Sequence, residues 1–198
     1  MLNCILAGVG GQGTVLASKL IAQSAMNKGQ KARTAETIGM AQRGGSVVSH
    51  VRIGEDIFSP MIPLKSADVI IGFEPAEAVR YLGYLKENGL IVVSKKAIKP
   101  VTVSLSESDY DGYEMLKYLL SHVKRLIVVD SDAICAACGS TKVINIALLG
   151  SAVATGVFGF SLADMEKTIA EKLPGRFVAM NLQALRIGAQ NVLEEHVS

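Results

Sequence analysis

Six residues near the start of the chain, Gly8-Val9-Gly10-Gly11-Gln12-Gly13, have the composition of a loop that binds a phosphate group. They follow a short apolar run, residues 2–7, and precede residues 14–28, in which apolar residues recur at helical spacing. Glycines let the chain turn tightly and let a ligand approach the backbone, and a helix start supplies free N–H donors. Gly8, Gly10 and Gly13 match the G-x-G-x-x-G spacing of dinucleotide-binding folds. Glycines that only let the first helix pack closely on the sheet explain the same pattern, so both interpretations stay open.

A second candidate is Arg43, which is followed by Gly44 and Gly45. A guanidinium group offers a fixed fork of donors to a phosphate or a carboxylate, and glycine neighbours permit close approach. The alternative is a loop arginine that pairs with a carboxylate at a protein interface. Gln12 also has two interpretations, because its amide can contact a ligand or hold the glycine turn.

Other reactive residues give weaker signals. Glu36 lies about 20 residues beyond the glycine loop, near the ribose-binding acid of a nicotinamide fold, and an exposed carboxylate explains it equally well. Cys135 and Cys138 have C-x-x-C spacing, but the third cysteine, Cys4, stands alone, so a four-thiolate metal site is not available. We predict that the pair are small residues on a packed helix. The three histidines lack the pattern of a hydrolytic triad.

The elements that position these residues alternate between strands and helices. Apolar runs predict strands at 2–7, 31–37, 67–73, 90–94 and 125–130. Helices are predicted at 14–28, 76–86, 113–123, 132–139, 143–153, 162–172 and 177–194. This order predicts an α/β fold with three layers, in which helices cover both faces of a mostly parallel sheet.

One region departs from a simple nucleotide-binding template. Residues 47–53 alternate between two faces, a turn signal follows at 54–56, and an apolar run resumes at 57–60. We therefore predict an inserted hairpin formed by residues 47–53 and 57–60. A doubly wound fold places a helix at this point.

The length and composition of the chain predict its number of domains, its class of partner and its cellular location. The chain has 198 residues, of which 49% are hydrophobic, so we expect one domain, 1–198, with C-terminal helices from about residue 143 packed on it. A net charge of +2 argues against a nucleic-acid partner. The longest apolar stretch, 143–160, is interrupted by polar residues and glycines, so no membrane span is expected. An odd number of cysteines and no secretory signal predict a cytoplasmic protein.

Three features together resemble the gamma domain of the 2-oxoacid:ferredoxin oxidoreductases. They are the loop at residues 8–13, the sequence Gln42-Arg43-Gly44-Gly45 ahead of a strand, and the C-terminal helices. In those helices, Asn145-x-x-Leu148-Leu149-Gly150 and Phe177-x-x-x-Asn181-x-x-Ala184-x-x-x-Gly188 are similar to the closing pattern of the family. The resemblance covers nearly the whole chain. Within the family it is strongest to the small (beta) subunits of the indolepyruvate-oxidising branch.

The resemblance implies a division of labour. Such enzymes decarboxylate a 2-oxoacid on thiamine diphosphate, pass electrons through iron–sulfur clusters to ferredoxin and release an acyl-coenzyme A. This chain has neither the four-cysteine spacing of a ferredoxin cluster nor the G-D-G signal of a thiamine diphosphate and magnesium site. Those cofactors are therefore expected in a larger partner subunit, and no catalytic residue is assigned here. Coenzyme A is the expected co-substrate, bound by backbone donors of Gly10, Gly11, Gln12 and Gly13 and by the charge of Arg43.

Two further expectations concern partners and alternatives. A subunit surface is expected among Val157, Phe158, Phe160 and the outer face of the closing helix, and self-pairing of this patch would give homodimers of the isolated chain. The alternatives to a subunit role are a free-standing nicotinamide-dependent oxidoreductase and a regulatory module that binds a nucleotide.

Overall fold

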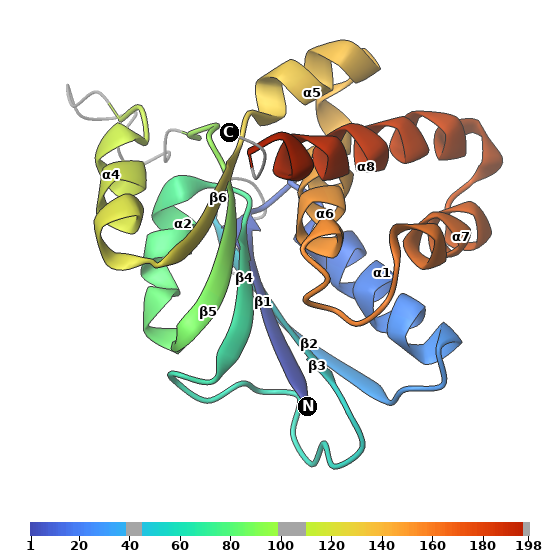
Figure 1. Ribbon diagram of the computed structural model, residues 1–198, viewed down its shortest axis with the longest axis horizontal. Coiled ribbons are helices and arrows are strands. Elements are labelled where there is room, and N and C mark those ends of the chain that lie inside the picture. Colours follow the sequence, from blue (N-terminus) through green and yellow to red (C-terminus); the bar gives the residue numbers. More distant parts are fainter. Residues whose placement is uncertain (39–44, 99–109, 196–198) are drawn as a thin grey trace.

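The computed structural model describes residues 1–38, 45–98 and 110–195. Its centre is a six-stranded sheet with the order β2-β3-β1-β4-β5-β6, and Figure 1 shows helices on both faces of it. The strands are β1 (Leu2–Val9), β2 (Ala32–Ile38), β3 (Ser46–Ile53), β4 (Ala67–Gly72), β5 (Leu85–Ser94) and β6 (Arg125–Val129). Strands β1, β4, β5 and β6 are parallel, and β3 is antiparallel to both of its neighbours. The predicted three-layer α/β fold is confirmed.

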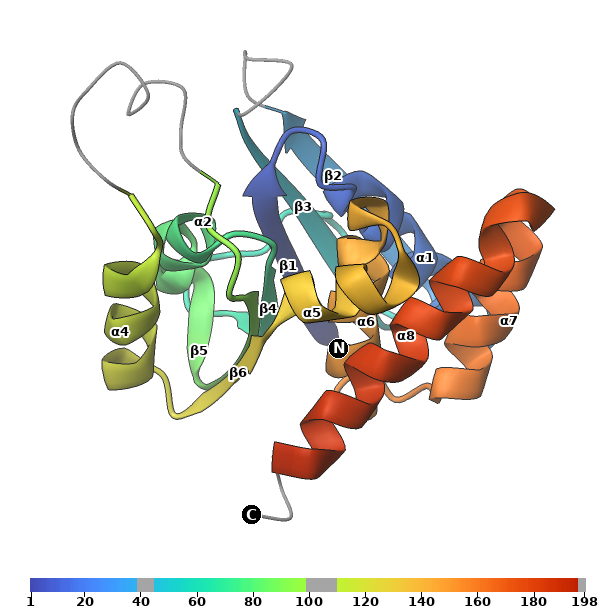
Figure 2. The same cartoon turned by 90° about the horizontal axis from the view of Figure 1, so that it is seen from above.

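Helices flank the sheet in two groups, which Figure 2 separates when the molecule is seen from above. One group contains α1 (Thr14–Asn27), α6 (Ile144–Ala154), α7 (Leu162–Lys172) and α8 (Gly175–Glu195). The other contains α2 (Pro75–Arg80), followed by the 3-10 helix η1 (Leu82–Tyr84), and α4 (Tyr113–His122). Helix α5 (Ser131–Cys138) and the 3-10 helix η2 (Thr141–Val143) connect β6 to α6. The C-terminal helices thus complete one layer of the fold.

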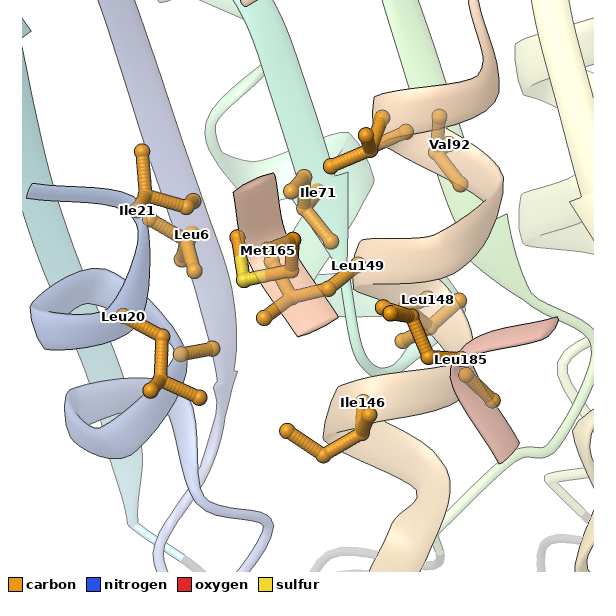
Figure 3. Packing of buried hydrophobic residues seen from close by; sticks show 14 of the residues in the cluster. Leu6, Leu20, Ile21, Ile71, Val92, Ile146, Leu148, Leu149, Met165 and Leu185 are labelled. Carbon is orange, nitrogen blue, oxygen red and sulfur yellow. The ribbon is translucent and has the colours of Figure 1, made fainter. Parts of the chain in front are cut away.

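The larger hydrophobic core lies between the sheet and the first group of helices (Figure 3). Leu6 and Ile71 come from the sheet, Leu20 from α1, Leu149 from α6 and Met165 from α7, and the side chains of all five are fully or almost fully buried. A smaller core covers the opposite face beneath α2 and α4. Because both faces are buried, the central strands carry nearly continuous apolar runs, which is why they were recognisable in the sequence.

Helices α6 and α8 cross at two glycines. A Cβ atom added to Gly150 would lie 2.0 Å from the carbonyl oxygen of Leu185, and one added to Gly188 would lie 2.1 Å from that of Ala147. The hydroxyl of Ser151 donates to the carbonyl oxygen of Gly188 at 2.7 Å and joins the same crossing. The glycines of the C-terminal pattern therefore allow direct backbone contact between the two helices.

The predicted hairpin is wrong, because residues 47–53 do not pair with residues 57–60. Strand β3 pairs with β1 along one edge and with β2 along the other, so no edge remains for residues 57–60. Those residues belong to the loop between β3 and β4. Arg52 holds this loop by donating to the carbonyl oxygens of Ser59 at 2.9 Å and Met61 at 3.3 Å. The antiparallel hairpin of this fold is β2–β3.

Two other expectations are corrected. The helix predicted at 76–86 ends at Arg80, because residues from Leu85 onward extend β5 and pair with β4 at Ala67. The expected surface patch is wrong for Phe158 and Phe160, which are only 3% and 4% exposed. Their rings stack with centroids 5.3 Å apart and belong to the larger core.

Candidate functional site

The glycine loop connects the end of β1 to the start of α1, and the side chain of Gln12 holds its shape. The amide oxygen of Gln12 accepts from the backbone N–H of Val9 at 2.8 Å. The amide nitrogen donates to the carbonyl oxygen of Phe73, just after β4, at 2.8 Å. The amide of Gln12 therefore holds the turn, and contact between Gln12 and a ligand stays a prediction.

Some backbone donors of the loop already have partners. The N–H of Gly10 donates to the carbonyl oxygen of Gly45 at 2.8 Å, and that of Gln12 donates to Val9 at 3.2 Å. Within the described ranges, the N–H groups of Gly11 and Gly13 have no such partner. Among the described residues, the N–H groups in the first turn of α1 also lack a capping side chain, since the N-cap residue is Gly13. The donors available to an anion are therefore Gly11, Gly13 and the first turn of α1.

Different structural constraints favour glycine at different positions of the loop. A Cβ on Gly8 would lie 2.7 Å from the Gln12 amide oxygen and 2.8 Å from the Cβ of Phe73, so Gly8 allows close packing. Gly13 has a φ of +81°, and its Cβ would lie 2.6 Å from the side-chain nitrogen of Asn145. Gly11 has a φ of +99° and faces open space. The loop is thus closely packed at both ends and open at its tip.

A cavity of about 480 Å³ lies beside this tip, in the size range of small-molecule sites. It is found at the carboxyl ends of β1 and β5, which is where open α/β sheets bind ligands. Its walls come from the glycine loop, the segment after β5, helix α5, helix η2 and the start of α6. The polar side chains among its lining residues are Gln12, Lys96, Cys135, Thr141, Lys142 and Asn145.

Lysines give the cavity a positive character. Lys96 donates to the carboxylate of Asp132 at 2.6 Å, and this contact raises the pKa of Lys96, which therefore stays protonated. Lys142, which lies in η2, also lines the cavity. Lys142, together with the helix N–H groups and with Lys96 in its pair with Asp132, makes a cavity suited to an anion. The sequence interpretation missed both lysines and the position of Asn145.

The thiol of Cys135 also lines the cavity, but its chemistry is that of a core residue. Burial raises the pKa of Cys135 and outweighs the opposing effect of the nearby Lys96 charge. The protonated thiol is a poor nucleophile and a poor metal ligand. Cys135 and Cys138 are both free, as expected for packed helix residues. In the described part of the chain, no group of three or more His, Cys, Asp or Glu side chains is arranged to hold a metal ion.

Arg43 and Gly44, which the sequence singled out, lie outside the described residues. Their neighbour Gly45 is placed, and its carbonyl oxygen accepts the hydrogen bond from Gly10. Gly45, the first described residue after them, thus contacts the glycine loop directly.

The remaining candidates lie away from the cavity. Glu36 is exposed on β2, accepts from the hydroxyl of Ser18 at 3.3 Å and is not among the residues that line the cavity. His50 is buried, its Nδ1 accepts from the N–H of Ile62 at 3.2 Å, and burial lowers its pKa. A second cavity, of about 440 Å³, lies between α1 and β2 and has a mostly apolar lining. Across residues 1–38, 45–98 and 110–195, no helix is both long and apolar enough to cross a membrane.

Comparisons with known proteins agree with this geometry. Residues 3–191 match the family described as pyruvate ferredoxin/flavodoxin oxidoreductase. Indolepyruvate oxidoreductase subunit IorB of Archaeoglobus fulgidus is 39% identical over 188 residues, which cover 94% of this chain and 93% of that protein. The protein of the same name from Pyrococcus horikoshii is 34% identical over 194 residues, covering 97% and 96% of the two chains.

Solved structures confirm the fold. The gamma subunit of a keto/oxoacid ferredoxin oxidoreductase from Geobacter sulfurreducens matches with a TM-score of 0.71 at 24% identity, covering 98% of this chain and 99% of that one. A chain of 2-oxoglutarate:ferredoxin oxidoreductase from Magnetococcus marinus matches with a TM-score of 0.72 at 17% identity, covering 98% of this chain but 31% of that longer one. The family resemblance seen in the sequence is confirmed: the chain belongs to the pyruvate ferredoxin/flavodoxin oxidoreductase family.

Proposed function

We propose that this chain is the small subunit of a 2-oxoacid:ferredoxin oxidoreductase that acts on indolepyruvate or a related aryl pyruvate. The support is its end-to-end similarity to proteins named indolepyruvate oxidoreductase subunit IorB, at 34–39% identity. In the longer Magnetococcus chain, a unit of the same fold forms about a third of a larger polypeptide. A domain that occurs both fused and free is suited to work in contact with other domains.

The partner in this proposal is a larger subunit that carries thiamine diphosphate, magnesium and iron–sulfur clusters and delivers electrons to ferredoxin. The cysteines of this chain do not fit a cluster, because Cys4 is fully buried in β1 and the other two lie on α5. Three free thiols also support a cytoplasmic location. The chain therefore contributes a binding surface rather than a complete active site.

The ligand that we assign to the cavity is coenzyme A, whose diphosphate suits the anion-binding features of the site. Gly11, Gly13 and the first turn of α1 would supply backbone donors, and Lys96 and Lys142 would supply charge. Gly8, Gly10 and Gln12 would hold the loop in shape. Arg43, with Gly44 and Gly45 beside it, would reach the same anion from the neighbouring segment. The observation that carries this assignment is the position of the cavity at the free start of α1.

The alternative, a free-standing nicotinamide-dependent oxidoreductase, requires an acid beside the cavity to bind the ribose. Glu36 is the acid that the sequence offers for this role, and it lies on β2 and does not line the cavity. A regulatory module that binds a nucleotide would also fit the cavity. Such a module would make no catalytic contribution to the assembled enzyme, which distinguishes it from the proposed subunit.

Activity of the separate and combined chains tests the proposal. We expect the isolated chain to show neither 2-oxoacid-dependent dye reduction nor tight NAD binding. Co-expression with the large subunit should give a stable heteromer that reduces the dye when indolepyruvate and coenzyme A are both present. The large subunit purified alone is the control. Turnover of NADH by the isolated chain, or separate migration of the two chains at micromolar concentration, would contradict the proposal.

A further inference from the structure

A buried carboxylate of α2 stands outside the ligand cavity. Glu77 is only 5% exposed and is not among the residues that line the cavity. Burying an ionised carboxylate is costly unless hydrogen-bond donors compensate it. Its Oε1 accepts from Nε of Arg80 at 3.2 Å, and its Oε2 accepts from the hydroxyl of Ser46 at 2.6 Å. The second contact links α2 to β3, a strand that is separated from β4 by β1.

Ser46 begins β3 at the end of the pairing between β3 and β1. It lies opposite Val9, the last residue of β1. One residue earlier, the carbonyl oxygen of Gly45 accepts from the N–H of Gly10 at 2.8 Å. The last pairs of two strands open most easily, because they have paired neighbours on one side only. The hydrogen bond from Ser46 to Glu77 therefore secures the two strands at the end that meets the glycine loop.

The alternation of side chains along β3 explains why the hydroxyl of Ser46 reaches α2. Residues 46 and 48 lie on the same face of the strand. Val48 packs in the smaller core together with Ala78, which follows Glu77 in α2. The packing of α2 on this face of the sheet thus brings the carboxylate of Glu77 to the start of β3.

Two hydrogen bonds hold the glycine loop to the neighbouring strands. The side chain of Gln12 donates to the carbonyl oxygen of Phe73, just after β4, and the N–H of Gly10 donates to Gly45, just before β3. Gly11 lies between the two held residues, and in the described part of the chain its N–H has no backbone partner. The direction of this free donor therefore depends on both connections.

We propose that Glu77 is a positioning residue of the glycine loop. Through Ser46, its carboxylate fixes the start of β3 and therefore the carbonyl group that holds Gly10. A loop that is fixed in advance presents its free N–H groups to an anion without reorganisation upon binding. Loss of this connection should weaken anion binding although no group that contacts the ligand is removed.

Hydrogen exchange of the Gly10 amide in the full chain measures whether the loop is held in this way. Ser46→Ala removes the donor, and Glu77→Gln removes the charge from the acceptor. Each change is expected to make exchange at Gly10 about tenfold faster, as the loss of a hydrogen bond to a charged group allows. In the double variant the two effects should not add, because both changes remove the same hydrogen bond.

Two further variants are the controls for this measurement. Ser46→Thr retains the hydroxyl and suits a strand, so exchange at Gly10 should keep its original rate. Arg80→Ala removes the donor to the other carboxylate oxygen, where water can replace the exposed arginine, and exchange at Gly10 should not change. Unchanged exchange in both Ser46→Ala and Glu77→Gln would overturn the inference. Equal acceleration in Arg80→Ala would also overturn it, because it indicates a general loosening of α2.

The kinetic part of the test rests on the proposed function and uses the assembled two-chain enzyme. Ser46→Ala and Glu77→Gln should each raise the apparent KM for coenzyme A about tenfold, while kcat at saturating coenzyme A is retained. A lower Tm with uniform loss of every partial reaction would overturn the inference, because it indicates a purely structural role. Faster exchange at Gly10 with an unchanged KM for coenzyme A would support the positioning of the loop by Glu77 and contradict the assignment of coenzyme A to the cavity.

Discussion

Replacing Gly150 with alanine is expected to lower the free energy of unfolding by about 3 kcal/mol, the upper part of the usual range for overpacking. The added Cβ would lie 2.0 Å from the carbonyl oxygen of Leu185, so α6 and α8 would have to move apart. The atom that it meets belongs to the backbone, and no side-chain rotation relieves the clash. For a chain of this length, such a loss lowers Tm by roughly 10 °C.

Thermal unfolding of the purified chain measures this effect, with Gly175→Ala as the matched control. Gly175 also lies in α8, has no left-handed φ, and an added Cβ there would meet nothing within 4 Å. Its replacement should leave Tm unchanged or slightly higher, because alanine favours helix. If Gly150→Ala unfolds at the temperature of the control, the described packing of α6 on α8 is wrong.

Arg43→Ala is expected to have the largest effect on the reaction of the assembled enzyme. A charge-assisted hydrogen bond to phosphate contributes about 1.5–3 kcal/mol. Loss of this hydrogen bond should raise the apparent KM for coenzyme A roughly tenfold to a hundredfold. Decarboxylation measured without coenzyme A should change little. Arg33→Ala is a suitable control, because Arg33 is an exposed arginine of β2 that does not line the cavity beside the glycine loop.

A different pattern would identify a different role for Arg43. If the arginine builds the contact between subunits, Arg43→Ala should weaken assembly and depress every partial reaction together. Assembly measured by size-exclusion chromatography beside the two kinetic assays distinguishes these results. Equal loss in both assays, with a smaller fraction of heteromer, would contradict the assignment of Arg43 to coenzyme A.

Much of the fold was predictable because its elements have strong local signals. Strand β4 is apolar except for Asp68, the core of β5 is a continuous apolar run, and the N-cap Ser161 of α7 forms a capping box with Asp164. The partner of residues 47–53 was not predictable in this way. Strand pairing depends on which edges remain free after folding, and the apolar run at 57–60 resembled a strand although Pro60 and the exposed Phe58 belong to a loop.

The candidate site was predictable in part. The glycine loop could be recognised, since its strand, turn and helix are contiguous in sequence. Lys142 and Asn145 come from more than 120 residues further along and reach the cavity only through the packing of α6 on the sheet. Lys96 carried a usable signal, because it follows a predicted parallel strand, and the carboxyl ends of such strands meet at one edge.

A structure of the two-chain complex with coenzyme A bound would decide whether the cavity beside the glycine loop is the coenzyme A site. We expect the diphosphate of coenzyme A against Gly11, Gly13 and the first turn of α1, with Lys96 and Lys142 beside it in the cavity. Density for coenzyme A far from the loop at residues 8–13 would rule out this site, even if the complex is active and the fold is as described.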